Sequence, residues 1–488
     1  MKLNYIAGNW VQGVDSIKND NPSDTNDIID EYSFASSEQA QMAIEAAADA
    51  APKWSQSSPL QRFEVLDAIG TEVIARKNEL GDLLAREEGK TLNEAVAEVN
   101  RAGYLFKFFA AEAFRSDSDG YSSIRSGVNL AVKREPLGVI GVITPWNFPV
   151  AIPAWKIAPA LAYGNTVVFK PAEIVPGSAW ALAEIISRSG LPEGVFNLVM
   201  GTGNVVGQAL VDSPLVEGIT FTGSTPVGKK IGARVFERGG KIQLEMGGKN
   251  PLIISNDADL DLAVNCAIQG SFYATGQRCT ASSRLIVEDA IHDKFVEKMI
   301  AAMGRLRIGD ARDANTDIGP VASAEQLEID KKYLQIGEQE GARKLIGGKL
   351  LKLHKSGYYL SPALFGETAN SMRINQEEIF GPVASIIRVC NFDEAIQVAN
   401  DVDVGLSAGI ITCDHQKIEE FISRVQAGMV QINLPTAGMD FHAPFTGRKG
   451  SSFGPPEKGS YCREFFTQAK VVHQGAMPQI NKGLRDAK

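Results

Sequence analysis

The sequence predicts an α/β protein in which helices cover a mostly parallel sheet, with two or more domains. Hydrophobic residues make up 44% of the 488 residues, a composition typical of globular proteins, and the chain is too long for one compact core. Along its middle, short apolar runs alternate with helix-like segments, as they do in βα units. Such alternation favours parallel strands joined by helical crossovers.

The alternation is clearest between residues 138 and 258. We expect strands at "GVIGVIT", "NTVVFKPA", "GVFNLVMG", "GITFTGS" and "KIQLEMGG". The helices between them are expected at "AWKIAPALAYG", "GSAWALAEIISRSG", near "VVGQALVDS" and at "VGKKIGARVFERG". A second series begins with "NPLIISNDA" and a helix from Asp259, and it runs to about residue 450.

One segment has the length of a membrane span. The 19 residues from Leu137 to Trp155, "LGVIGVITPWNFPVAIPAW", carry no charge. However, Pro145, Pro149 and Pro153 would interrupt the hydrogen bonds of a single helix repeatedly. A buried strand leading into a loop is therefore the better interpretation.

Charge and cysteine content exclude several classes of protein. A net charge of −9 without long runs of Lys and Arg gives no attraction to nucleic acid or to an anionic membrane. The five cysteines are widely spaced and form no C-x-x-C pair, which argues against a disulfide framework and a structural zinc site. The first residues, "MKLNYIAGNWVQG", lack the features of a secretion signal. We expect a cytoplasmic protein without a metal.

Polar loops follow the predicted strands, where open parallel sheets bind their ligands. Gly223, Ser224 and Gly228 open a helix directly after a strand, and the amino terminus of a helix suits phosphate, although an ordinary glycine turn fits the spacing as well. Lys170 and Glu173 follow a neighbouring strand and suit the hydroxyls of an adenosine ribose. Taken separately, either side chain is typical of solvated surface.

A cysteine stands beside an arginine in "ATGQRCTASSR". A neighbouring cation stabilises a thiolate, so Arg278 could help to activate Cys279 as a nucleophile. The pattern alone leaves other roles for Arg278 open.

Six motifs together indicate a family. "TPWNFP", "VFKPAE", "FTGSTPVG", "LEMGGKN", "GQRCTA" and "EEIFGP" occur in the order and spacing of the NAD(P)-dependent aldehyde dehydrogenase superfamily, which the chain resembles through nearly its whole length. The resemblance implies a Rossmann-type cofactor domain, an α/β catalytic domain and a small β oligomerisation element, hence a homodimer or homotetramer. These would be residues 1–114 with 136–247, residues 248–450, and residues 115–135 with 463–476.

The resemblance also implies the catalytic residues. Cys279 would attack the aldehyde carbon, and the Asn147 side-chain amide would stabilise the oxyanion with the Cys279 backbone N–H. Glu245, beside Gly247 and Gly248, would activate the water that hydrolyses the thioester. Relatives that transfer the acyl group to coenzyme A lack this glutamate, so we expect a free carboxylic acid as product.

For the cofactor, the resemblance implies NAD or NADP. Glu173 favours NAD because its carboxylate repels a 2′-phosphate, whereas Lys170 has the opposite effect. Glu378 and Phe380 in "EEIFGP" match contacts to the nicotinamide half. The full predicted set is Thr144, Trp146, Lys170, Glu173, Gly223, Ser224, Gly228, Glu378 and Phe380.

"NLPTAGMDFHAPFTGRKGSSFG" and "GQRCTASSR" resemble the branch that oxidises 2-oxoglutarate semialdehyde (2,5-dioxopentanoate) to 2-oxoglutarate. Arg278 could bind the far carboxylate of this substrate through two hydrogen bonds. Succinate semialdehyde, a broad range of aliphatic aldehydes, and a surface role for Arg278 remain alternatives. The predicted substrate site comprises Phe148, Arg278, Phe441 and Phe445.

Two hypotheses from other functional classes compete with the aldehyde dehydrogenase hypothesis. A cysteine hydrolase would need a histidine partner, and the C-G-[SA]-C-[WY] signature is absent. A catalytically inactive relative would tend to lose Cys279, Glu245 or Asn147, and the sequence retains all three.

Overall fold

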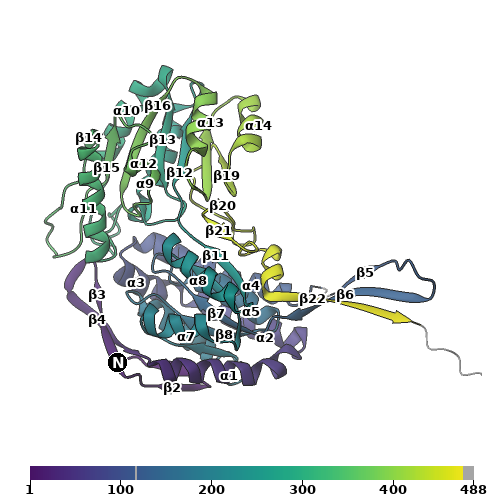
Figure 1. Ribbon diagram of the computed structural model, residues 1–488. Helices are drawn as coiled ribbons and strands as arrows, with labels where there is room; N and C mark the ends of the chain where they lie inside the picture. Colours follow the sequence, from purple (N-terminus) through teal and green to yellow (C-terminus); the bar gives the residue numbers. More distant parts are fainter. Residues whose placement is uncertain (116–117, 476–488) are drawn as a thin grey trace, which may run out of the picture.

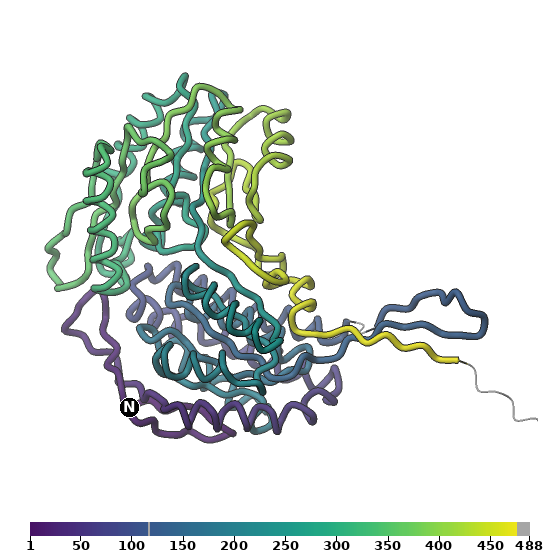
Figure 2. The backbone as a smooth tube through the Cα atoms, in the orientation of Figure 1, coloured from purple at the N-terminus to yellow at the C-terminus, as the bar shows by residue number. Residues whose placement is uncertain are grey.

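Two helix-covered sheets form the body of the protein, and a smaller sheet extends away from it (Figure 1). The structure is a computed structural model that describes residues 1–115 and 118–475. Figure 2 traces the chain through the first half (purple to teal), through the second (green), and back to the first (yellow) before it enters the extended sheet. We call the body built on the eight-stranded sheet the first half, and the body built on the seven-stranded sheet the second half.

The sheet of the first half has the strand order β2-β1-β9-β8-β7-β10-β11-β21. Its five central strands are parallel, and the strands at both edges are antiparallel to their neighbours. All five strands expected between residues 138 and 248 are confirmed. The strands are β1 (Asn4–Ile6), β2 (Asn9–Val11), β7 (Val139–Ile143), β8 (Thr166–Lys170), β9 (Phe196–Leu198), β10 (Val216–Thr222), β11 (Lys241–Glu245) and β21 (Ser452–Phe453).

The expected crossover helices are also present. The uncharged segment that begins at Leu137 forms the fully buried strand β7, a loop and the start of a helix. That helix begins at Ala151, three residues before the expected start, because Pro153 lies in its first turn, where backbone N–H groups have no helical partner. No described helix is long and apolar enough to cross a membrane. The helices are α5 (Ala151–Ala162), α6 (Pro176–Ser187), α7 (Gln208–Asp212), which follows a π-helical turn at Gly203–Gly207, and α8 (Thr225–Glu237).

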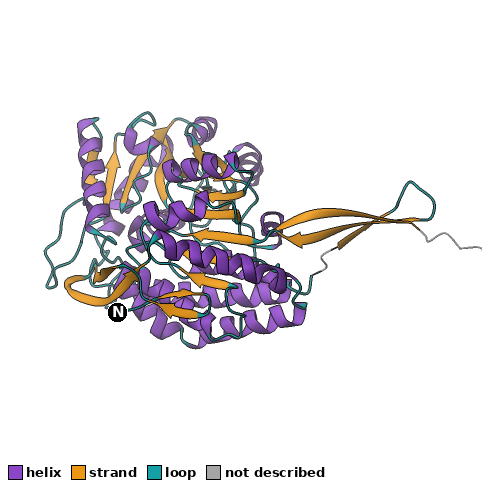
Figure 3. Ribbon diagram, turned by 60° about the horizontal axis from the view of Figure 1, so that its bottom comes forward, coloured by secondary structure: helices purple, strands orange, loops and turns teal. Residues whose placement is uncertain are grey.

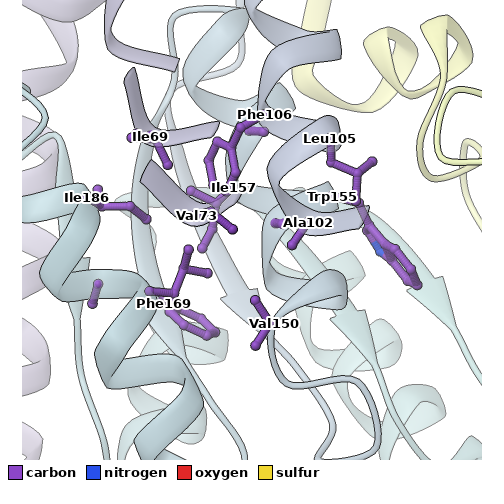
Figure 4. Close-up of a cluster of buried hydrophobic side chains, with 14 of the residues drawn as sticks. Ile69, Val73, Ala102, Leu105, Phe106, Val150, Trp155, Ile157, Phe169 and Ile186 are labelled. Atoms are coloured by element: carbon purple, nitrogen blue, oxygen red, sulfur yellow. The ribbon is translucent and has the colours of Figure 1, made fainter. Parts of the chain in front are cut away.

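Four helices precede these βα units in the sequence and contribute to the hydrophobic core of the first half. Figure 4 shows Leu105 and Phe106 of α4 gathered with Val73 of α2, Ile157 of α5 and Phe169 of β8 in one buried cluster. This packing fixes α4 against α5, and so fixes where the polar side of α4 points. The elements are α1 (Ser37–Ser55), α2 (Pro59–Ala75), α3 (Lys77–Glu88) and α4 (Leu92–Glu112), with a hairpin of β3 (Asp15–Asn21) and β4 (Asp24–Phe34).

The sheet of the second half has the order β14-β15-β16-β13-β12-β18-β19, in which only β14 is antiparallel to its neighbour. The expected strand after Lys249 and the helix from Asp259 are confirmed, and the Asp259 carboxylate caps that helix by accepting from the N–H of Asp261 and Leu262. The strands are β12 (Asn250–Ile254), β13 (Ser282–Glu288), β14 (Arg343–Ile346), β15 (Ala363–Gly366), β16 (Val383–Val389), β18 (Ser407–Ile411) and β19 (Met429–Ile432). The helices are α9 (Leu260–Phe272), α10 (Asp289–Met303), α11 (Ala324–Gln339), α12 (Arg373–Gln376), α13 (Phe392–Asn400) and α14 (His415–Arg424).

The extended sheet is antiparallel, with the order β22-β6-β5 (Figure 3). It joins two segments that the sequence assigned to an oligomerisation element, although positions 116, 117 and 476 of those segments lie outside the described residues. Its strands are β5 (Ser118–Tyr121), β6 (Val128–Pro136) and β22 (Thr467–Gly475). The remaining short elements are β17 (Val404–Gly405), β20 (Arg448–Lys449), α15 (Arg463–Phe466) and 3-10 helices at Tyr273–Gly276 and Ser460–Cys462.

Candidate active site

Cys279 lies in the loop between α9 and β13, on the wall of a cavity of about 310 Å³. The loop begins with a strained turn, in which Ala274 and Thr275 have φ angles of 51° and 55°. The Thr275 hydroxyl donates to the carbonyl oxygen of Gly319 at 3.1 Å and so holds this turn against the loop before α11. Farther along, the Asn250 side chain donates to the carbonyl oxygens of Cys279 and Ala281 at 2.8 and 2.9 Å. The position of the thiol is therefore set from both sides.

Asn147 reaches the Cys279 loop from the first half. Its amide nitrogen donates to the carbonyl oxygen of Gln277 at 3.0 Å, and its own carbonyl oxygen accepts from the ammonium of Lys90 at 2.5 Å. Lys90 is buried and forms an ion pair with Glu98 at 2.7 Å. Because an amide nitrogen carries two hydrogens, one N–H of Asn147 stays available to an oxyanion.

Glu245 ends strand β11 and is buried. Burial raises its pKa well above the usual range, the charge of Glu457 adds to this effect, and a hydrogen bond from the Ser452 hydroxyl opposes it. Glu457 in turn accepts from Trp155 at 2.6 Å and from Lys156. A carboxylate with a raised pKa is a stronger base, which suits the activation of water.

The environment of Cys279 favours the thiol over the thiolate. Burial raises the pKa of Cys279 to about 12, and the carboxyls of Glu378, Glu245 and Glu457 add to the shift. The Arg278 guanidinium does not offset this. It donates instead to the Glu94 carboxylate at 2.6 Å. Proton removal from the thiol therefore needs a base rather than the neighbouring cation.

The ends of β7 and β8 carry four of the predicted cofactor residues. Lys170 forms an ion pair with Glu173 at 3.3 Å, and the N–H of Gly203 donates to the same carboxylate at 2.7 Å. Thr144 lies at the end of β7, and within the described part of the chain its buried hydroxyl has no hydrogen-bond partner. Trp146 follows in the same loop. A buried hydroxyl without a protein partner fits a site that awaits a polar ligand.

Gly223 and Ser224 join β10 to α8. Ser224 is the residue before the helix, and its side chain makes no capping bond, which leaves the first N–H groups of a 13-residue helix for an anion. Gly228 packs against Met246 so closely that an added Cβ would lie 2.6 Å from the Met246 sulfur. Together with the Thr144 hydroxyl, this helix end fits the phosphates and ribose of a dinucleotide.

Glu378 and Phe380 approach the same region from the second half, in the loop before β16. Glu378 accepts from the N–H of Gly248 at 3.0 Å, and burial raises its pKa to about 7. Phe380 has a φ of 64° and meets Trp146 edge to face, with ring centroids 5.3 Å apart. The predicted cofactor residues of the two halves thus come together at these rings.

Residues 10–472 match the aldehyde dehydrogenase family. The chain belongs to this family. It is 44% identical over 474 residues to the alpha-ketoglutaric semialdehyde dehydrogenase of Bacillus subtilis, covering 96% of this chain and 97% of the relative. It is 39% identical over 474 residues to the 2,5-dioxopentanoate dehydrogenase of Saccharolobus solfataricus, covering 96% and 98%.

Two solved structures share the fold. The betaine aldehyde dehydrogenase of Staphylococcus aureus in complex with NAD+ superposes with a TM-score of 0.95 at 33% identity, covering 99% of this chain and 97% of that one. An NADP-dependent enzyme of E. coli superposes with a TM-score of 0.94 at 33% identity, covering 97% and 98%. The α/β fold class predicted from the sequence is therefore confirmed.

The predicted substrate residues of this aldehyde dehydrogenase divide into two groups. Phe148, Arg278 and Phe445 line the cavity beside Cys279. Phe441 packs instead against Tyr104 of α4, with ring centroids 5.7 Å apart, and is not part of the cavity wall. The described residues contain no group of three or more His, Cys, Asp or Glu side chains that could hold a metal ion.

The sequence analysis did not identify a charged face of α4 as part of the site. Glu94, Glu98 and Arg101 are spaced by four and three residues, which places them on one face of the helix, and all three line the cavity. Lys458 lines it from the far end of the chain. The helical spacing of the three α4 charges could have predicted that they share one face of the helix. Nothing in the sequence around Lys458 indicates that it lines the cavity.

Proposed function

We propose that this enzyme oxidises 2-oxoglutarate semialdehyde to 2-oxoglutarate through a covalent adduct on Cys279. The observation that carries the chemistry is the meeting of Cys279 and Asn147 near the buried carboxyl of Glu245, where the two halves join. The choice of substrate rests on the relatives that act on this semialdehyde and match nearly the whole chain.

In the first step the Cys279 thiol loses its proton to water, and its sulfur attacks the aldehyde carbon. The carbonyl oxygen then carries negative charge, which the free N–H of Asn147 and the backbone N–H of Cys279 stabilise. Lys90 and Glu98 keep Asn147 in place, since Lys90 bonds its carbonyl oxygen and Glu98 accepts from the N–H groups of Val150 and Ala151 at 3.0 and 3.1 Å. Bound NAD or NADP supplies the hydride acceptor for the oxidation, which leaves a thioester.

In the second step Glu245 takes a proton from a water molecule, which attacks the thioester carbon. The C–S bond breaks, the carboxylic acid leaves, and Glu245 returns the proton to the Cys279 sulfur. The raised pKa of Glu245 suits this role. Gly247 lies beside Glu378, whose carboxylate oxygen would be 1.9 Å from an added Cβ, so a side chain at position 247 would displace that carboxylate.

For the cofactor, Thr144, Lys170, Glu173 and the amino end of α8 would hold the adenosine and phosphate groups. Trp146, Glu378 and Phe380 would hold the nicotinamide half. The ion pair with Glu173 partly neutralises Lys170 and so weakens its attraction for a 2′-phosphate. This favours NAD slightly, with NADP as an alternative.

The domain limits are part of the proposal. Residues 1–114 with 136–247 bind the cofactor, residues 248–450 carry the nucleophile, and residues 115–135 with 463–476 join subunits. The extended β22-β6-β5 sheet supports an oligomer because it protrudes from the body, with β22 mostly exposed and β6 only partly buried. Light scattering of the purified protein distinguishes a homodimer from a homotetramer. The cytoplasmic location of the protein stays a prediction.

The test is a substrate panel assayed with both cofactors. We expect the highest kcat/KM for 2-oxoglutarate semialdehyde, measured by the absorbance of the reduced nicotinamide. Succinate semialdehyde is the main competitor, since the mitochondrial succinate-semialdehyde dehydrogenase of Arabidopsis thaliana is 37% identical over 474 residues. A higher value for succinate semialdehyde or pentanal would overturn the substrate, and no reduction with any aldehyde would overturn the proposed chemistry.

A further inference from the structure

The charges around the cavity beside Cys279 do not balance. Its wall carries more cations than carboxylates, and each carboxylate already has a cationic partner. Lys90 is paired with Glu98 at 2.7 Å, and Arg278 is paired with Glu94 at 2.6 Å. The cations are Lys90, Arg101, Arg278 and Lys458, and the carboxylates are Glu94 and Glu98. Two cations, Arg101 and Lys458, form no ion pair with a carboxylate of residues 1–115 or 118–475.

Arg101 stands on the cavity side of α4. Among the described residues its guanidinium forms no hydrogen bond and no ion pair, although the residues on either side of it in sequence belong to a packed helix. Burial lowers the pKa of Arg101, the nearby Arg278 adds to this effect, and Glu98 and Asp440 oppose it. The Arg101 guanidinium, which carries five N–H donors, thus lines the cavity without an acceptor among the described residues.

Lys458 is 2% exposed and has a φ of 58°. Within the part of the chain that the structure describes, its ammonium donates to one acceptor, the carbonyl oxygen of Asp440 at 3.2 Å, and it lies 5.2 Å from the ring centroids of Trp155 and Phe445. Burial lowers the pKa of Lys458 to about 8, and the charge of Arg101 adds to the shift. Holding a buried ammonium with one carbonyl is costly unless an anion joins it.

The charge of the exposed Asp440 acts on both cations, while Glu98 acts also on Arg101 and Glu457 also on Lys458. In the described structure none of these carboxylates forms an ion pair with Arg101 or Lys458, since Glu98 pairs with Lys90 and Glu457 with Lys156. The aromatic rings of Trp155 and Phe445 stack with centroids 5.7 Å apart and line the same cavity as Cys279. The cavity therefore combines a nucleophile, an apolar wall and two unpaired cations.

We propose that Arg101 and Lys458 form the subsite for the carboxylate at the far end of the substrate, and that Arg278 serves mainly to hold Glu94. The inference rests on the proposed function, because it takes the aldehyde carbon to lie at Cys279. A guanidinium binds a carboxylate through two parallel hydrogen bonds, and the ammonium can bind the neighbouring 2-oxo oxygen. The ligand class is thus a short 2-oxo acid with an aldehyde at its other end.

The test compares Arg101→Met and Lys458→Met with the unaltered enzyme. The measured quantity is the ratio of kcat/KM for 2-oxoglutarate semialdehyde to kcat/KM for pentanal, which lacks the carboxylate. Each substitution should lower this ratio roughly 10- to 100-fold, the usual effect of losing a charge-assisted hydrogen bond. Arg101→Lys should recover part of the loss. Lys107→Met is the matched control, because Lys107 is on the same helix but pairs with Asp67 outside the cavity.

A second measurement needs no turnover of the semialdehyde. 2-Oxopentanoate has the same 2-oxo acid end but a methyl group in place of the aldehyde, so it should inhibit pentanal oxidation competitively. Its inhibition constant should rise by a similar factor in both Met variants. Their melting temperatures should stay level or rise, since each substitution removes an unpaired buried charge.

The outcomes separate this inference from the proposed function. If the enzyme prefers another carboxylated aldehyde, the substrate assignment fails, while the inhibition by 2-oxopentanoate still tests Arg101 and Lys458. Unchanged ratios and inhibition constants in both Met variants would overturn the subsite. A larger loss in Arg278→Leu than in either Met variant would return the carboxylate to Arg278, and a falling melting temperature without a change in ratio would make both cations structural.

Discussion

The two halves present opposite ends of their sheets to the active site. In the first half, Thr144, Lys170, Gly223 and Glu245 lie at or just beyond the carboxyl ends of parallel strands. In the second half, the residues that reach the site, including Cys279 and Phe380, come just before β13 and β16, at the amino ends of strands. The rule that ligands bind at carboxyl strand ends therefore locates the cofactor side but not the nucleophile.

This difference also divides the chemical work. The proposed base Glu245 comes from the first half and the nucleophile Cys279 from the second. Substitutions of these two residues should consequently fail at different steps, and kinetics can show whether this division holds.

The largest effect is expected in the second half. Cys279→Ala should abolish dehydrogenase activity and leave cofactor affinity nearly unchanged, because the sulfur forms the covalent adduct and contributes little to dinucleotide binding. Activity and the dissociation constant of NAD, from quenching of tryptophan fluorescence, are the measurements. Cys413→Ala, at an exposed cysteine, is the control. Residual turnover above the uncatalysed rate would remove Cys279 from the mechanism.

The matching change in the first half is Glu245→Gln. It should release a burst of reduced cofactor and then turn over ~10²- to 10⁴-fold more slowly, because acylation precedes the step that needs activated water. Stopped-flow absorbance separates the burst from steady turnover, with the exposed Glu237→Gln on α8 as control. If the burst is missing, Glu245 acts before hydride transfer and the division between the halves breaks down.

The pH dependence of the thiol sharpens the comparison further. Since the pKa of Cys279 is raised to about 12, its thiolate fraction in the cofactor-free protein should rise tenfold per pH unit below that value. Alkylation of Cys279 by iodoacetamide should thus accelerate about 100-fold between pH 7 and pH 9. Mass spectrometry of the digested protein measures it site by site. A rate that is flat over this range would indicate a stabilised thiolate and restore that role to Arg278.

The smallest effect is expected for cofactor choice in the first half. Glu173→Ser removes the carboxylate that repels a 2′-phosphate and also frees Lys170 from its ion pair, so the NAD to NADP ratio of kcat/KM should fall roughly tenfold. Glu193→Ser provides a comparison at another carboxylate. An unchanged ratio would show that Glu173 does not select the cofactor.

The sequence was sufficient for the alternating core because each strand there is a short buried run between loop residues. It placed the start of α5 three residues late, since a proline in the first helical turn looks like a helix breaker when only the pattern is read. It could not reveal the charge balance of the cavity. The partner of Glu94 is 184 residues away at Arg278, and such pairing exists only after folding.

The hydrophobic pattern of the sequence also could not predict the antiparallel edge strand β21. It has two residues, too few for a periodicity, and it pairs with β11 across a gap of about 200 positions in the sequence. The same holds for Lys458, which is defined by the cavity it reaches rather than by its neighbours in the chain.

The return of the chain to the first half has a consequence for how the protein is made. Strand β21 pairs with the edge strand β11 at Glu245, and β22 pairs with β6 over nine residues. Glu457 forms an ion pair with the buried Lys156. On the ribosome, the first half therefore emerges early but lacks these three pieces until almost the entire polypeptide has been translated. Until then β6 is an unpaired edge and Lys156 a buried charge without its counter-ion, so the nascent first half should depend on chaperones more than an independently folding domain would.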